Sequence, residues 1–178
     1  MTDGTQAIRA IVNGQAVEAV VPIRMLLVDF LRERLQLTGT HVGCTFEGVC
    51  GACTVRLDGE AVKSCMLLAA QIDGRQVTTV EGLARGEEPH PLQKAFRDAH
   101  ALQCGYCTPG ILLTAEALLV DIPMPTRDEI KYALSGNLCR CTGYTKILDA
   151  VELAALRMRR QGEVQPQASP ADKGIART

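Results

Sequence analysis

Eight cysteines are the residues of this sequence most able to do chemistry, and they form two groups of four. The first group is Cys44, Cys50, Cys53 and Cys65, and the second is Cys104, Cys107, Cys139 and Cys141. Because thiolates repel one another, four of them held close together need a bound positive charge. Eight cysteines in 178 residues is well below the content of disulfide-built secreted scaffolds. The sequence therefore predicts one metal or cluster site in each group.

The spacing of the first group indicates an iron-sulfur cluster. Plant-type [2Fe-2S] ferredoxins carry C-x4-C-x2-C on one loop and a fourth cysteine further along the chain. The run 44–53 reads C-x5-C-x2-C, one residue longer in its first gap, and Cys65 supplies the fourth thiol. Gly43, Gly48 and Gly51 are expected to take positive φ and to bring backbone amides to the sulfurs. The extra residue changes the expected path of the loop but removes no ligand.

The second group lies on two loops next to predicted helices. Cys104 and Cys107 come just before a helix start, where the helix dipole favours a thiolate. Cys139 and Cys141 lie in the turn between the third and fourth predicted helices, with Arg140 between them. Their C-x-C spacing is awkward for a local disulfide, because a bridge needs a specific Cα separation. The two loops are therefore expected to share one cluster.

Other interpretations of the cysteines stay open on spacing alone. They are two structural zinc sites, buried unreactive thiols, or a redox dithiol at Cys104 and Cys107. Zinc sites usually pair two C-x2-C knuckles, whereas each half of this sequence has only one such pair. The histidines His41, His90 and His100 lack the spacing of a Rieske site and receive no predicted role.

The first 80 or so residues are predicted to form a mixed α+β domain that positions the first group. Runs rich in β-branched residues at 8–12 and 17–21 flank Asn13-Gly14, which is typical of a hairpin turn. Apolar residues recur every three or four positions over 24–35, which predicts an amphipathic helix. Further strands are expected at 54–57, 61–68 and 76–80.

The pattern becomes helical after Gly82. The sequences Thr108-Pro109 and Thr126-Arg127-Asp128-Glu129 are predicted helix starts, the second as a capping box. Helices are expected at 92–102, 109–120, 127–134 and 146–160. The predicted divisions are a first domain at 1–82, a linker at 83–91, a four-helix domain at 92–160 and a mobile tail at 161–178.

Composition excludes several classes of protein. A chain of 178 residues that is 47% hydrophobic can form at least one real core. Its 19 basic and 20 acidic side chains, without a dense basic block, argue against a nucleic-acid or anionic-lipid partner. Residues 1–10 lack a signal-peptide pattern, and no apolar run approaches the roughly 20 residues that span a bilayer. We therefore expect a soluble cytoplasmic chain.

Three strings, GVCGACTV, QCGYCTPG and GNLCRCTGY, occur in this order. Because of these strings, the chain resembles the iron-sulfur subunit of the molybdenum hydroxylase (xanthine oxidase) family. The resemblance covers roughly residues 8–160. The resemblance implies an N-terminal β-grasp ferredoxin-like domain and a C-terminal four-helix domain, each holding one [2Fe-2S] cluster. It also implies partner subunits: a large one with a molybdenum-pterin cofactor and, in many members, a medium one with FAD.

The resemblance further implies roles for single residues. Electrons would pass from molybdenum to the cluster of the second group, then to the β-grasp cluster and then to FAD, and in the reverse direction in acyl-CoA reductases. Gln103 matches the glutamine that hydrogen-bonds the pterin, and Cys141 matches the ligand whose sulfur lies nearest to it.

The sequence supports hypotheses from two classes. In the first, the chain is the electron-transfer subunit of a larger oxidoreductase and catalyses nothing alone, since it has no GxGxxG, P-loop or catalytic triad spacing. In the second, it is a zinc-stabilised interaction module. An independent ferredoxin with two clusters is a third interpretation. Colour separates zinc from iron, because [2Fe-2S] clusters absorb visible light and zinc thiolates do not.

Overall fold

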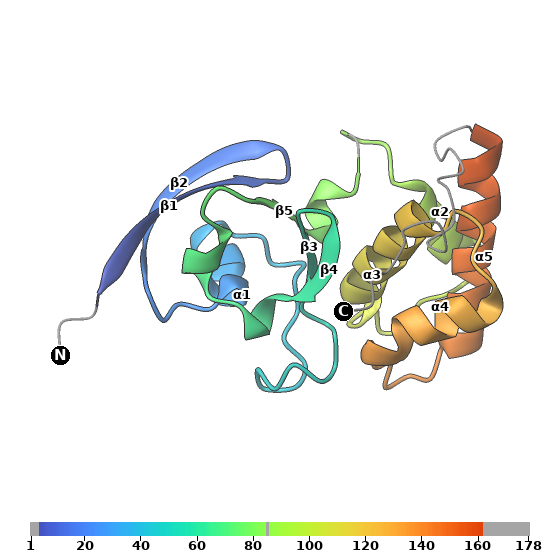
Figure 1. Cartoon of the computed structure of the whole chain (residues 1–178). Coiled ribbons are helices and arrows are strands. Elements are labelled where there is room, and N and C mark those ends of the chain that lie inside the picture. Colours follow the sequence, from blue (N-terminus) through green and yellow to red (C-terminus); the bar gives the residue numbers. More distant parts are fainter. Residues whose placement is uncertain (1–3, 85, 162–178) are drawn as a thin grey trace, which may run out of the picture.

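A computed structural model describes residues 4–84 and 86–161. The chain folds into a sheet-containing half and a helical half that lie side by side (Figure 1). Among the described residues, no helix is both long and apolar enough to cross a membrane. The mobile tail predicted at 161–178 lies, beyond Gln161, outside the described residues.

The N-terminal half is a five-stranded mixed sheet with strand order β2-β1-β5-β3-β4. The strands are β1 (Thr5–Val12), β2 (Gln15–Pro22), β3 (Thr54–Leu57), β4 (Glu60–Lys63) and β5 (Gln76–Thr78). The hairpin of β1 and β2 turns through Asn13 and Gly14, both with positive φ, as the sequence predicts. Strand β5 runs parallel to β1 and antiparallel to β3. This topology confirms the predicted β-grasp fold.

The predicted helix at 24–35 is shorter in the structure. Helix α1 (Leu27–Asp29) continues directly as a π-helical turn, Phe30–Arg34. It begins at Leu27 because Leu26 is extended and pairs with Leu68 in an isolated β-bridge. The apolar face of the helix is buried in the same core as the sheet, with Phe30 and Leu31 completely inaccessible.

The strand predicted at 61–68 is wrong beyond Lys63. Residues Ser64–Met66 form a 3-10 turn instead of continuing β4. The buried Ser64 hydroxyl donates to the Cys53 carbonyl oxygen at 2.7 Å, and its backbone N–H donates to the same oxygen at 3.2 Å. This turn is what brings Cys65 back to Cys53, so the departure from strand geometry serves the first cysteine group.

The C-terminal half contains the four predicted α-helices. They are α2 (Pro91–Asp98), α3 (Thr108–Asp121), α4 (Arg127–Ala133) and α5 (Tyr144–Gln161). The capping box at α4 is confirmed, because Thr126 Oγ1 accepts from the Glu129 N–H and Glu129 Oε2 accepts from the Thr126 N–H. Helix α3 begins one residue earlier than predicted, with Cys107 at the N-cap and Thr108 already helical.

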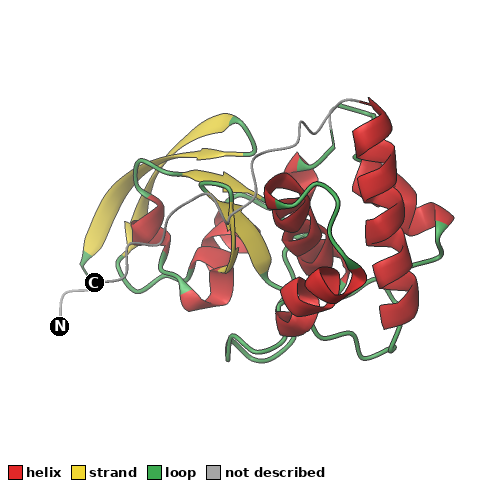
Figure 2. Ribbon diagram, turned by 45° about the vertical axis from the view of Figure 1, so that its right-hand side comes forward, coloured by secondary structure: helices red, strands yellow, loops and turns green. Residues whose placement is uncertain are grey.

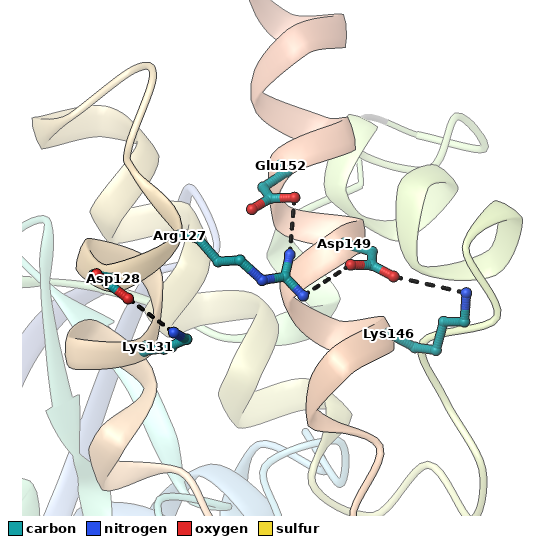
Figure 3. Close-up of polar contacts among 6 residues, drawn as sticks. All are labelled: Arg127, Asp128, Lys131, Lys146, Asp149 and Glu152. Atoms are coloured by element: carbon teal, nitrogen blue, oxygen red, sulfur yellow. Dashed lines mark hydrogen bonds and ion pairs between the residues drawn. The ribbon is translucent and has the colours of Figure 1, made fainter.

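Ionic contacts hold α4 against α5 (Figure 3). The Arg127 guanidinium lies between Asp149 and Glu152 of α5, with N···O distances of 3.0 Å to each carboxylate. The pKa of Arg127 is raised by its hydrogen bonds to Glu152 and Asp149. All three side chains are more than a third exposed, so each contact contributes little alone. These contacts help to position the loop between α4 and α5, which carries Cys139 and Cys141.

The two halves meet along helix α3, which packs against β3 and β4 (Figure 2). The core runs without a break through both halves. Gly110 of α3 lies directly on the loop of the first cysteine group: a Cβ built on it would be 2.1 Å from the Gly51 carbonyl oxygen. Arg56 of β3 forms an ion pair with Glu116 of α3, and both side chains are less than a fifth exposed.

Replacing Glu116 by alanine should lower the free energy of unfolding by about 3 kcal/mol, because it leaves the largely buried Arg56 charge without its carboxylate. Burial already raises the pKa of Glu116 despite the guanidinium beside it. Urea unfolding of Glu116→Ala and of the double variant Arg56→Leu/Glu116→Leu measures this, and the double variant should recover most of the loss. Glu88→Ala, which breaks an exposed pair with Lys94, is the matched control. Equal losses in Glu88→Ala and Glu116→Ala would contradict the expectation.

Candidate metal centres

The first cysteine group is brought together by one loop and one turn. Cys44, Cys50 and Cys53 lie on the loop before β3, and Cys65 lies in the 3-10 turn after β4. The thiols pair within hydrogen-bonding reach, Cys44 with Cys50 and Cys53 with Cys65, and Cys50 also acts electrostatically on Cys53. The four sulfurs therefore form two adjacent pairs.

The loop departs in part from the expected glycine geometry. Gly48 and Gly51 have positive φ as predicted, but Gly43 does not. A Cβ on Gly43 would lie 3.1 Å from Cys50 Sγ, so this glycine is needed for space rather than for conformation. Thr45 and Phe46 also have positive φ, which is uncommon for residues with a side chain. The longer gap between Cys44 and Cys50 is thus accommodated by left-handed backbone at two non-glycine residues.

Backbone amides and burial act in opposite directions on the first group. The pKa of Cys44 is lowered to about 7, chiefly by the backbone N–H of Cys50, with further N–H donors at Val49 and Glu47. Burial raises the pKa of Cys53 to about 12. The amides favour the thiolate form of Cys44, at the more exposed end of the group. The buried Cys53 needs a bound cation to lose its proton.

This difference predicts a site-selective reaction of the iron-free chain. At pH 7 about half of Cys44 is thiolate, against about one in a hundred for a thiol of ordinary pKa 9.0. Because folding lowers this pKa, Cys44 stabilises the fold above pH 9, and that contribution disappears as the pH falls through about 7.

Peptide mass spectrometry after brief iodoacetamide treatment should therefore find Cys44 labelled well before Cys53, with a rate midpoint near pH 7. A midpoint near pH 9 for Cys44 would contradict the expectation.

The second group has the same paired arrangement. Cys104 pairs with Cys141, Cys107 pairs with Cys139, and Cys104 acts electrostatically on Cys107. Cys107 is the N-cap of α3, and Cys139 and Cys141 lie between α4 and α5. The structure thus brings the two predicted loops together.

The electrostatics of the second group differ between its first two cysteines. The pKa of Cys104 is lowered chiefly by the backbone N–H of Tyr106, which belongs to the loop before α3. At Cys107, the N-cap of α3, the expected preference for thiolate is wrong, because burial and the neighbouring Cys139 thiol raise its pKa to about 12.

The paired sulfurs fit binuclear clusters. A [2Fe-2S] cluster takes two protein ligands on each of its irons, and each group presents two thiol pairs side by side. All eight cysteines are free thiols.

A cavity of about 410 Å³ lies between the two groups. It is bordered by Cys50 of the first group and by Cys104, Cys107 and Cys139 of the second. The loops also touch directly, since the Leu138 N–H donates to the Cys50 carbonyl oxygen at 2.8 Å. The two candidate centres are therefore neighbours.

Gln103 lies on the surface next to the second group. Its Nε2 donates to the Cys141 carbonyl oxygen at 3.2 Å, so the side chain is held against the loop that carries Cys141. Asn137 and Tyr144 support this loop, although the sequence predicted no role for either. Asn137 is buried and donates from Nδ2 to the Gly51 carbonyl oxygen, and the Cys139 N–H donates to the Tyr144 hydroxyl oxygen at 2.7 Å. Both residues belong to the string GNLCRCTGY, and this string was the only sequence feature that could have pointed to them.

Comparison with known proteins identifies both halves. Residues 10–84 match the family model of the 2Fe-2S iron-sulfur cluster binding domain, and residues 79–152 match that of the [2Fe-2S] binding domain. Caffeine dehydrogenase subunit gamma of Pseudomonas sp. (strain CBB1) is 54% identical over 144 residues, which cover 79% of this chain and 86% of that protein. The nicotine 6-hydroxylase small subunit of Paenarthrobacter nicotinovorans is 54% identical over 140 residues, covering 79% and 84%.

Solved structures agree with these relatives. In the crystal structure of quinoline 2-oxidoreductase from Pseudomonas putida 86, a chain with 49% sequence identity superposes with a TM-score of 0.84, covering 90% of this chain and 99% of that one. Aldehyde oxidoreductase from Desulfovibrio gigas superposes with a TM-score of 0.83 at 37% identity, covering 93% of this chain and 19% of that one. The predicted fold class and the two [2Fe-2S] domains are confirmed. The chain belongs to the small, electron-transfer [2Fe-2S] subunits of the molybdenum hydroxylase family, which are parts of multi-subunit oxidoreductases.

Proposed function

We propose that each cysteine group ligates one [2Fe-2S] cluster and that the thiol pairs share an iron. In the first cluster Cys44 and Cys50 bind one iron and Cys53 and Cys65 the other. In the second, the pairs are Cys104 with Cys141 and Cys107 with Cys139. The thiol–thiol contacts within each pair support this assignment. When bound, the clusters supply one-electron redox chemistry, and the amide donors at Cys44 and Cys104 stabilise negative charge on the sulfurs.

The observation that carries the relay function is the hydrogen bond between the two cluster loops. The Leu138 N–H donates to the carbonyl oxygen of Cys50, and Leu138 is bonded directly to Cys139. A ligand of the first cluster is thus connected to a ligand of the second through backbone atoms and one hydrogen bond of 2.8 Å. We infer that electrons pass between the clusters along this short connection.

We propose an order of transfer, which the surface position of each cluster supports. Gln103 and Cys141 lie at the exposed edge of the second cluster, and we propose that they face the molybdenum-pterin cofactor of a large partner subunit. Exposed apolar side chains surround each centre. They are Leu102, Tyr106 and Leu138 at the second centre, and Phe46, Val49 and Met66 at the first. Such patches are typical of interaction sites, and the first patch would face a medium FAD-binding subunit or another acceptor.

The domain limits and the location of the chain are also proposals. We propose a β-grasp domain at 1–82, a linker at 83–91, a four-helix domain at 92–160 and a tail at 161–178. Support comes from the strands, which end at Thr78, and from α2, which begins at Pro91. Eight free thiols are typical of a reducing compartment, which supports a cytoplasmic location. The balanced charge supports protein partners and no nucleic acid.

Coexpression with the neighbouring genes tests the function. The chain should copurify with a large molybdenum-containing subunit and a flavoprotein subunit, and rapid freezing after substrate addition should give the paramagnetic signals of two reduced [2Fe-2S] clusters. A chain that elutes as a free monomer, with no cluster reduced by any substrate of the neighbouring subunits, would contradict the proposal.

A further inference from the structure

His41 and Tyr106 lie face to face where the two cluster loops meet. Their ring centroids are 4.5 Å apart, and the ring planes are inclined by 18°. The His41 Nδ1–H donates to the Tyr106 carbonyl oxygen at 2.8 Å. The Tyr106 hydroxyl donates to the Val42 carbonyl oxygen at 2.7 Å. Two hydrogen bonds and a ring stack therefore join Tyr106 to the two neighbouring residues His41 and Val42 of the other loop.

Tyr106 also reaches both sulfur groups. It lies between Cys104 and Cys107 in sequence, and its backbone N–H donates to the Cys104 sulfur. Tyr106 also borders the cavity between the centres. A Cβ built on Gly43 would be 3.5 Å from Tyr106 Cε1 and 3.1 Å from Cys50 Sγ, so the ring packs beside the first group.

We propose that His41 and Tyr106 form a clamp that fixes the separation of the two clusters and thereby the rate of electron transfer between them. The inference rests on the proposed function, because it assigns both cysteine groups to clusters that exchange electrons. Both residues act through the loops and are positioning residues. The rate of electron transfer falls steeply with the separation of donor and acceptor. A small shift between the loops therefore has a large effect on this rate.

The clamp differs from the other contacts along the seam. The Arg56–Glu116 pair and the packing of α3 on β3 hold the bodies of the two halves together. The clamp instead joins the loop of the first group to the loop of Cys104 and Cys107. The hydrogen bonds from Leu138 to Cys50 and from Asn137 to Gly51 join the first group to the other loop, which carries Cys139 and Cys141.

Three variants of the complete enzyme test the clamp. Tyr106→Phe removes the hydroxyl bond and keeps the ring, whereas His41→Phe keeps a stacking ring and removes the Nδ1 bond. The double variant His41→Ala/Tyr106→Ala removes all three contacts. Tyr132→Phe and His100→Asn are matched controls, since both residues are exposed and lie away from the seam.

Iron analysis first establishes that each variant carries both clusters. Three measurements are then made on each variant. Hydrogen exchange of the segments 40–44 and 104–107 reports the loop contact. The magnetic splitting between the two reduced clusters reports their separation, and the rate of electron transfer between them reports the function. Exchange in Tyr106→Phe should be about fivefold faster, the effect of one lost hydrogen bond. The double variant should show a changed splitting and a slower transfer, and both controls should match the unaltered chain.

Unchanged splitting and transfer rate in the fully loaded double variant would overturn the clamp, even if exchange became faster. If the double variant does not bind iron, the splitting and the transfer rate are measured on Tyr106→Phe and His41→Phe, each of which keeps an aromatic ring in place. Unchanged values in both of these variants would then overturn the clamp. Failure of the proposed function would look different, since the unaltered enzyme itself would then show no transfer between clusters.

Discussion

Replacing Cys141 by serine in the complete enzyme should leave molybdenum reducible by substrate and should stop electrons from reaching the flavin. Cys141 pairs with Cys104 at the exposed edge of the second group, where Gln103 donates to its carbonyl oxygen. A hydroxyl at this place is a weaker ligand than a thiolate, because its pKa is far higher. The cluster that receives electrons first in the proposed order is then lost or altered.

Cys44→Ser should interrupt the same relay one step later. The second cluster should still be reduced by substrate, and the flavin should stay oxidised, because only the first centre is damaged. Stopped-flow spectra of the flavin and freeze-quench paramagnetic resonance of the clusters distinguish the two variants. Ser135→Ala, an exposed position close to the loop of Cys139, is the control and should behave as the unaltered enzyme. Normal flavin reduction in both cysteine variants would contradict the assigned order.

Gly110→Val should have a large effect although it lies away from the cysteines. A Cβ at this position would be 2.1 Å from the Gly51 oxygen, 3.1 Å from the Gly51 carbon and 3.2 Å from the Ala52 carbonyl carbon. All three atoms belong to the backbone, so no side chain can move aside to relieve the clash. Helix α3 must then withdraw from the loop of the first group. Overpacking of this kind costs about 1–3 kcal/mol, and more when backbone must shift.

The withdrawal of α3 should also separate the clusters, which distinguishes this substitution from simple destabilisation. We expect slower transfer between clusters at temperatures where the variant is still fully folded. Gly136→Ala is the matched control, since its added Cβ would meet only the flexible end of the Lys63 side chain at 3.4 Å. Thermal unfolding and flavin reduction should be measured on both variants. If Gly110→Val unfolds at the same temperature as Gly136→Ala and its flavin is reduced at the same rate, the close approach of α3 does not affect electron transfer.

Local sequence signals predicted the features that depend on near neighbours. The capping box at Thr126 and Glu129 fixed the start of α4, and the Asn13-Gly14 turn fixed the first hairpin. The grouping of eight cysteines into two sets was also readable, because their spacing is a property of the chain itself. The family strings then implied the fold.

Features that depend on distant partners were missed. The strand expected at 61–68 ends at Lys63 because Ser64 bonds to Cys53, eleven residues earlier. Gly43 has a spatial role beside Cys50 and Tyr106 that its own conformation does not reveal. His41 had no predicted role, since its partner Tyr106 is 65 residues away. Pairing of the thiols likewise comes from the folded loops and not from spacing.

We expect this small chain to hold two [2Fe-2S] clusters on its eight cysteines. Iron and acid-labile sulfide should be assayed in complex purified without oxygen, and paramagnetic resonance should be recorded after dithionite reduction. About four iron and four sulfide per copy of this chain should be found, with two distinct signals. A colourless preparation with about two zinc per chain and no signal on reduction would contradict it.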